Sequence, residues 1–183
     1  MPGRHVRPHE YGPDDIIGDK YRLLSVLGEG GMGEVWLARN LDLEVDVAIK
    51  LIRADVSGPE TTRRLMQEAR AVARLGHPAI VRVHDLGRTS YGDPFLVMEL
   101  LQGEPLDEVL DSKGCLPAVN AVQLLLPIVS GLAAAHEEGI VHRDLKPENI
   151  FLATRGDDVT PKLVDFGVAK VVEDTESIPP ASS

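Results

Sequence analysis

A glycine-rich segment between two strand-like stretches constrains the fold most strongly. Residues Gly28–Val35 read GEGGMGEV and follow the apolar run Tyr21–Leu27. The residues after the glycines alternate in polarity, and Val45–Lys50 alternates again after a turn near Asp42. Alternation of this kind is typical of β-strands. Three strands in succession predict an antiparallel meander with the glycines at its first hairpin.

This order of elements argues against a dinucleotide-binding fold. A glycine turn of that class leads from a strand into a helix, whereas here it leads into a second strand. Two interpretations of the glycines stay open. They form either a flap whose backbone N–H groups close over phosphates or an ordinary flexible hairpin.

A helix is predicted over residues 57–76, with Pro59 in its first turn and Gly76 at its end. Glu68 falls on the apolar face of this helix, where a carboxylate is costly unless it meets a cation. Lys50, on the preceding strand, is the candidate partner. The alternative is that Glu68 lies at the edge of the apolar stripe, in water.

Two further strands are predicted at Ile80–Val83 and Pro94–Met98, followed by a connection at Glu99–Gly103. A short helix is expected at Leu106–Leu110 and a long one over 117–138. The long helix is apolar nearly all round, so we expect other elements to cover it on several sides. Its most apolar part, residues 121–135, is shorter than the roughly 20 residues that a bilayer requires, and no membrane segment is predicted.

The segment His142–Asn149 reads HRDLKPEN and lies between two apolar runs, as a polar loop held at both ends. Asp144 can accept a proton, Lys146 can face an anion, and the Asn149 amide oxygen can bind a hard metal ion. A short strand over residues 162–164 then leads into the triplet Asp165-Phe166-Gly167.

Composition excludes some classes of function. The net charge of −10 argues against a nucleic-acid partner, and the single Cys115 allows neither an internal disulfide nor a cysteine metal site. Residues 1–18 are rich in Pro, Gly, His and charge, which predicts a flexible tail. The tail lacks the apolar core of a signal peptide, so we expect a cytoplasmic protein.

Together these motifs closely resemble those of eukaryotic-type serine/threonine protein kinases, which also occur in bacteria. The resemblance implies an α+β, two-lobed fold. Its complete five-stranded N-lobe with a helix C occupies residues 19–99, and a partial, mainly helical C-lobe occupies 100–170. Residues 171–183 would begin a disordered activation loop.

The resemblance also implies a role for each matching residue. Lys50, held by Glu68, would bind the α- and β-phosphates of ATP, Asp144 would receive the proton of a substrate hydroxyl, and Lys146 would steady the γ-phosphate. Asn149 and Asp165 would bind Mg²⁺. The residues implied to cover or contact the rest of the nucleotide are Leu27, Gly28, Glu29, Gly30, Gly31, Met32, Gly33, Val35, Ala48, Met98, Glu99, Leu101 and Phe151. Val72, Val83, His142 and Phe166 match a hydrophobic column between the lobes.

The family pattern also guides the choice among functions. Lys146 after Asp144-Leu145 is the serine/threonine version, so the expected partners are ATP and a protein with a Ser or Thr acceptor. Arg143 resembles kinases with a phosphorylated activation loop, in which Thr175 and Ser177 would be candidate sites.

The family continues with an A-P-E-like motif and further helices, which this sequence does not contain, so an incomplete domain with an exposed helix 117–138 is expected. The alternatives are a nucleotide-binding module without catalysis, an interaction domain, and a small-molecule phosphotransferase.

Overall fold

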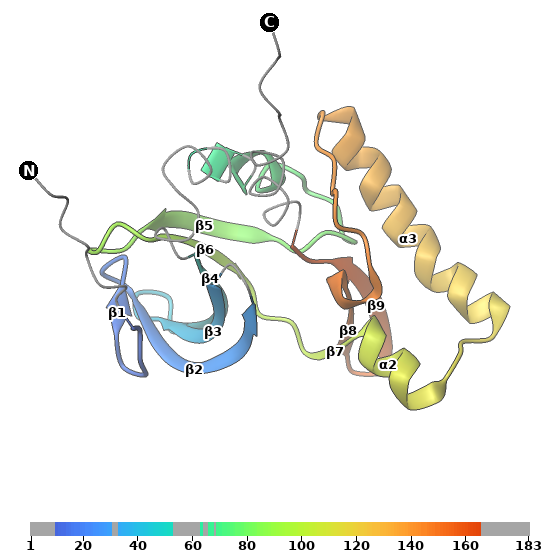
Figure 1. Cartoon of the computed structure of the whole chain (residues 1–183), viewed down its shortest axis with the longest axis horizontal. Coiled ribbons are helices and arrows are strands. Elements are labelled where there is room, and N and C mark those ends of the chain that lie inside the picture. The colour runs from blue at the N-terminus through green and yellow to red at the C-terminus, as the bar shows by residue number, and fades with distance from the viewer. Residues whose placement is uncertain (1–9, 31–32, 53–62, 64–65, 68, 166–183) are drawn as a thin grey trace, which may run out of the picture.

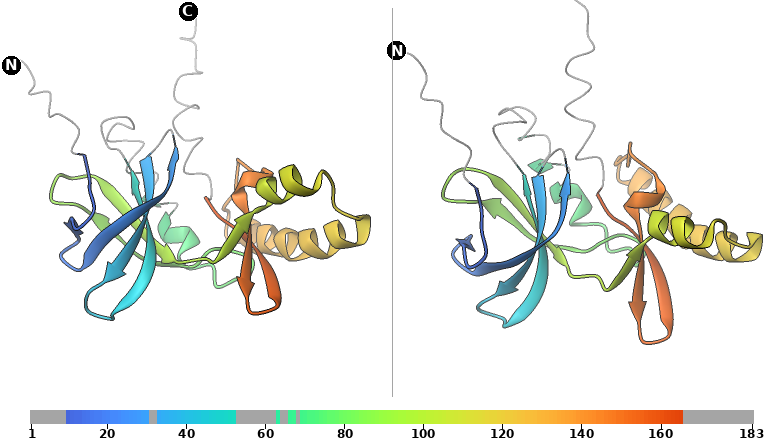
Figure 2. Two further views of the ribbon diagram at one scale, coloured as in Figure 1. Left: turned by 90° about the horizontal axis from the view of Figure 1, so that it is seen from below. Right: turned by 60° about the horizontal axis from the view of Figure 1, so that its bottom comes forward.

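The computed structural model describes residues 10–30, 33–52, 63, 66–67 and 69–165. These residues form two lobes that lie side by side (Figure 1) and are joined at a narrow waist (Figure 2). The elements are β1 (Ile16–Ile17), β2 (Tyr21–Gly30), β3 (Gly33–Asn40), β4 (Val45–Ile52), β5 (Val83–Arg88), β6 (Pro94–Glu99), β7 (Gly103–Pro105), α2 (Leu106–Lys113), α3 (Ala118–Glu137), the 3-10 helix η1 (Pro147–Asn149), β8 (Ile150–Arg155) and β9 (Asp158–Leu163).

The first lobe is a six-stranded antiparallel sheet in the order β1-β2-β3-β4-β6-β5. Five strands were expected, and the additional one is the short β1, which lies in the predicted tail. The predicted meander of β2, β3 and β4 is confirmed. The predicted strand Ile80–Val83 is wrong, because β5 begins only at Val83. The preceding main chain pairs with the other lobe instead: Ile80 forms a parallel bridge with Leu163.

Two local features explain the tight connections of the meander. The Asn40 side-chain oxygen accepts hydrogen bonds from the backbone N–H groups of Asp42 and Leu43, at 3.0 and 3.1 Å, and so caps the turn between β3 and β4. At the other end of β3, Gly33 has φ +147°. A Cβ there would lie 1.9 Å from the Leu51 carbonyl oxygen, so only glycine fits.

A helix packs on this sheet. Residues 66–72, apart from residue 68, are helical, and Met66 and Ala69 form a buried cluster with Ile52 and Leu96. The predicted start of the helix at residues 57–62 and the whole of residue 68 lie outside the described residues.

The second lobe contains α2, α3 and a three-stranded sheet in the order β7-β8-β9. Its core continues into the first lobe through Val72, Ala79 and Ile80, which pack with Ile128 and Leu163. The helices were predicted from their apolar spacing, whereas β7 and β8 were not. Residues 171–183, predicted to begin a disordered loop, lie outside the described residues.

The prediction of a flexible tail is wrong for residues 10–18. Ile17 is 3% exposed and pairs with Tyr21 in the sheet. The Tyr11 hydroxyl donates to Asp93 Oδ2 at 2.8 Å and lies 2.8 Å from Thr89 Oγ1. The strand Ile16–Ile17 and the Tyr11 side chain thus attach residues 10–18 to the sheet and to the β5–β6 turn.

The expectation from apolarity alone, that α3 is covered on several sides, is wrong, whereas the exposed helix 117–138 expected from the family resemblance is confirmed. Only Ile128, Gly131 and Ala135 are buried along its 20 residues. The large apolar side chains on its open side are Val119, Val122, Leu125, Leu126 and Val129, each between 43% and 67% exposed. By length and composition α3 could cross a membrane, but its buried side packs in the core of the second lobe.

The contact of Tyr11 with the β5–β6 turn can be measured as stability. Tyr11→Phe removes the hydroxyl that faces Asp93 and Thr89, so the free energy of unfolding should fall by about 1–2 kcal/mol. Urea denaturation measures this change. Val159→Ala is the control, since the Val159 side chain is 58% exposed and lies in the other lobe. Equal midpoints for Tyr11→Phe and the wild type would show that the segment is not anchored there.

The open face of α3 should promote self-association, because large apolar patches seek cover. The double variant Val122→Glu/Leu126→Lys places a favourable i, i+4 charge pair on that face. We expect a smaller sedimentation coefficient at high concentration and weaker binding of an apolar dye. Leu43→Glu, at an isolated side chain that is 70% exposed, should change neither measurement. An unchanged dye signal in the double variant would contradict the prediction.

Candidate active site

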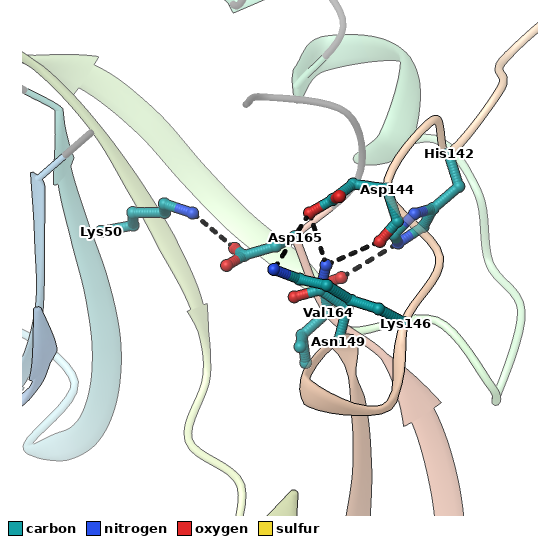
Figure 3. Close-up of polar contacts among 7 residues, drawn as sticks. All are labelled: Lys50, His142, Asp144, Lys146, Asn149, Val164 and Asp165. Atoms are coloured by element: carbon teal, nitrogen blue, oxygen red, sulfur yellow. Dashed lines mark hydrogen bonds and ion pairs between the residues drawn. The ribbon is translucent and has the colours of Figure 1, made fainter. Parts of the chain in front are cut away.

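The two lobes meet at an ion pair between Lys50 and Asp165. Lys50 Nζ on β4 lies 2.6 Å from Asp165 Oδ1, just after β9 (Figure 3). The Lys50 side chain is 12% exposed and that of Asp165 is 40% exposed. A cation of one lobe therefore faces a carboxylate of the other, at the edge of solvent.

Main-chain contacts at the end of β9 fix the position of Asp165. Leu163 is fully buried, accepts a hydrogen bond from the Val81 N–H at 2.9 Å, and donates to the Ala79 carbonyl at 2.8 Å. The Val164 N–H donates to the Asn149 carbonyl at 3.0 Å. Asp165 itself has φ +56°, a conformation that costs free energy in a residue other than glycine and is often found at functional sites.

The loop before η1, together with the last residue of η1, gathers three polar side chains (Figure 3). Asn149 Nδ2 donates to the carbonyl oxygen of Asp144 at 2.7 Å and to its carboxylate Oδ2 at 3.0 Å. Lys146 Nζ lies 3.6 Å from the same Oδ2. Asp144 is therefore an oriented carboxylate between an amide and a cation, with its side chain 25% exposed.

His142 ties this loop to the segment that carries Asp165. Its ring is 2% exposed, and Nε2 lies 3.1 Å from the Val164 carbonyl oxygen. A carbonyl only accepts, so Nε2 carries the proton. Burial lowers the pKa of His142 below its usual value, although the bond to Val164 and the nearby carboxylates of Asp144 and Asp165 oppose that shift.

The oxygen ligands present fit a hard divalent cation. Because Asn149 uses its amide nitrogen on Asp144, its amide oxygen is the group left to face a ligand, and Asp165 contributes a carboxylate nearby. The described residues hold no cluster of three or more His, Cys, Asp or Glu side chains suited to a metal. The Asn149 amide oxygen and the Asp165 carboxylate are typical ligands of Mg²⁺, which is held by one or two protein oxygens together with water and phosphate.

The first-lobe residues implied to cover the nucleotide lie on neighbouring strands beside Lys50, whereas Leu101 lies in the connection between β6 and β7 and Phe151 lies on β8. Gly28, Val35 and Lys50 are consecutive cross-strand partners, and Ala48 pairs with Met98. Leu27 is 52% exposed and Ala48 is 8% exposed, whereas Val35, Met98, Leu101 and Phe151 are half-buried. Glu29 and Gly30 pair with Glu34 and Gly33 at the hairpin. Gly31, Met32, Glu68 and Phe166 lie outside the described residues, so the Lys50–Glu68 pair stays a prediction.

An apolar recess lies behind the ion pair. Its lining residues are Lys50, Ala69, Val72, Val81, Val83, Leu96, Met98 and Asp165. Val72, Val83 and His142 of the predicted column are all buried, and the first two belong to one core cluster.

Sequence reasoning missed one partly buried ion pair near the site. Lys162 on β9 lies 2.7 Å from Glu99 Oε1 at the end of β6. The only signal was a single cation beside the apolar residues Leu163 and Val164, which is too common a pattern to indicate a partner far away in the sequence.

Comparison with known proteins identifies the family of this chain. The protein kinase domain family matches residues 21–182. The chain belongs to the protein kinase domain family. This kinase domain is 43% identical over 164 residues to the serine/threonine-protein kinase pkn2 of Myxococcus xanthus, covering 88% of the chain and 19% of that relative. It is 39% identical over 166 residues to the serine/threonine-protein kinase PknB of Mycobacterium leprae, covering 88% and 26%.

Solved structures agree with the fold. The kinase domain of Mycobacterium tuberculosis PknI superposes with a TM-score of 0.76 at 28% identity, over 87% of this chain and 64% of that one. The two-lobed kinase fold expected from the sequence is confirmed. The kinase domain described here spans between about a fifth and a third of the length of the curated relatives that it matches.

The buried ring of His142 predicts how the stability of the kinase domain depends on pH. A lowered pKa in the folded state means that the contribution of neutral His142 is complete above the unfolded pKa of about 6.5. That contribution is lost as pH falls through the folded pKa. Below pH 6.5 the unfolding free energy of the wild type should therefore fall by up to about 1.4 kcal/mol per pH unit more than that of His142→Gln.

Urea titrations between pH 7.5 and pH 5 measure this difference in slope. His84→Gln is the matched control, since His84 is exposed. Equal slopes for the wild type and His142→Gln would contradict a buried, neutral ring.

Proposed function

We propose that the domain binds ATP with Mg²⁺ between its lobes and transfers the γ-phosphoryl group to Ser or Thr hydroxyls of a protein substrate. The observation that carries this proposal is the 2.6 Å contact between Lys50 and Asp165, with Asp144, Lys146 and Asn149 gathered beside it. Family membership supports ATP and Mg²⁺ as its ligands.

In this proposal the first lobe binds the nucleotide. Lys50 is the cation for the α- and β-phosphates, and the backbone N–H groups of the hairpin between β2 and β3 close over them. The adenine ring lies between the side chains of Ala48 and Phe151, and its edge meets the backbone of Glu99 and Leu101.

The second lobe supplies the chemistry. Asp144 Oδ accepts the proton that the Ser or Thr hydroxyl loses as its oxygen attacks phosphorus. Lys146 offsets negative charge on the transferring oxygens. The bond between the γ-phosphorus and the oxygen that bridges it to the β-phosphate breaks, and ADP is the leaving group. Mg²⁺, held by the Asn149 and Asp165 oxygens, would neutralise charge on the phosphates when bound.

The serine/threonine choice rests on the relatives and on Lys146. Both curated relatives described above are named serine/threonine-protein kinases. Because ATP is a cytoplasmic nucleotide, we propose that the domain acts in the cytoplasm.

Binding and transfer can be separated by two variants. Lys50→Met should weaken ATP binding about tenfold or more, since one charge-assisted bond is lost. Asp144→Asn should leave ATP affinity nearly unchanged and reduce phosphate transfer at least about 100-fold. Calorimetry measures the first effect and radiolabelled phosphate transfer to casein measures the second.

Asp46→Asn is the matched control for the second variant, because Asp46 pairs with Arg39 on the surface. It should retain both activities. Failure of the wild type to bind ATP would overturn the proposal. ATP binding without transfer above the Asp144→Asn background would instead favour the second interpretation, a nucleotide-binding module without catalysis.

A further inference from the structure

The connection between the lobes is anchored at both of its ends to the hairpin of β8 and β9. At its start, Glu99 Oε1 lies 2.7 Å from Lys162 Nζ on β9. At its end, the Gln102 carbonyl accepts hydrogen bonds from the Thr154 N–H at 2.8 Å and the Thr154 hydroxyl at 3.3 Å. Leu100 and Leu101 lie between these anchors.

Two hydrogen bonds with the main chain of Arg82 also fix the position of Glu99. Glu99 Oε1 also accepts the Arg82 N–H at 2.8 Å, and the Glu99 N–H donates to the Arg82 carbonyl at 3.0 Å. The side chains of Lys162 and Glu99 are 16% and 26% exposed. The pair is partly buried, so removal of one partner leaves the other charge with reduced solvation.

The geometry also links this pair to the proposed adenine site. Lys162 is the cross-strand partner of Phe151, and directly opposed residues of antiparallel strands share a face. The ion pair therefore joins the strand beside Phe151 to the residue whose backbone is proposed to meet the adenine edge.

We infer that Lys162 is a positioning residue for the adenine ring, which it serves by holding Glu99 at a fixed separation from Phe151. Lys162 acts through the Glu99 carboxylate and does not touch the nucleotide. This inference rests on the proposed function, because it needs an adenine nucleotide in the cleft.

The test separates the base from the phosphates. Lys162→Met keeps the apolar stem and removes the charge. If the residue positions the base, the affinities for adenosine, ADP and ATP should all fall by the same factor, about tenfold. Lys50→Met should weaken ADP and ATP while leaving adenosine unchanged. Calorimetric titration of the 183-residue chain gives all three constants.

Three further single variants and one double variant complete the experiment. Lys162→Arg keeps the charge and should recover most of the affinity. Lys20→Met removes an ion pair with Asp85 in the first lobe and should have no effect on binding. Glu99→Gln keeps an oxygen for the Arg82 N–H but removes the charge that pairs with Lys162, so this variant should bind adenosine more weakly than the wild type. The double variant Glu99→Gln/Lys162→Met should bind adenosine no more weakly than Lys162→Met alone.

The outcomes distinguish this inference from the proposed function. A wild-type chain that binds neither adenosine nor ATP would overturn the proposed function itself. Normal nucleotide binding with unchanged affinity in Lys162→Met would overturn only the positioning role. Loss confined to ADP and ATP, or additive losses in the double variant, would also overturn it, because Lys162 would then act on the phosphates or independently of Glu99.

Discussion

The arrangement of the two lobes depends on the burial of one residue, Leu163. Its N–H and carbonyl groups bond to the main chain of residues 79–81, and its side chain has no exposed area. Buried main-chain groups without partners are costly, so this pairing holds the end of β9 against the segment that leads into β5. Asp165, two residues later, is thereby brought within 2.6 Å of Lys50.

The charges around the cleft are matched within the protein. Lys50 lies against Asp165 and Lys146 lies near Asp144, although the chain as a whole carries a net charge of −10. If a phosphate bound, Lys50 and Lys146 could pair with it in place of Asp165 and Asp144. A divalent cation would then neutralise the carboxylate that had lost its lysine partner. The same pairs would allow an acidic chain to accept the proposed acidic ligand.

Local sequence patterns predicted the elements but not their distant partners. The alternation in β2, β3 and β4 and the apolar spacing of α2 and α3 depend on neighbouring residues, and those elements were found. Residues 80–82, Tyr11 and Lys162 contact residues far away in the sequence, which no periodicity reveals. The apolar surface of α3 indicated burial, yet only the side facing Ile80 and Leu163 is covered by described residues. Hydrophobicity does not identify the element that covers a helix, and the exposure of α3 was expected only from the family resemblance.

The strand β9 serves both ends of the proposed nucleotide site. Lys162 points to Glu99 beside the proposed position of the base, and Asp165 follows three residues later beside the proposed position of the phosphates. The backbone between them is held by the bonds of Leu163 and Val164. A short, bonded segment keeps a fixed length, so a displacement of β9 would move both anchors together. The proposed positions of the base and of the metal ion therefore depend on one structural property of this strand and not on two independent ones.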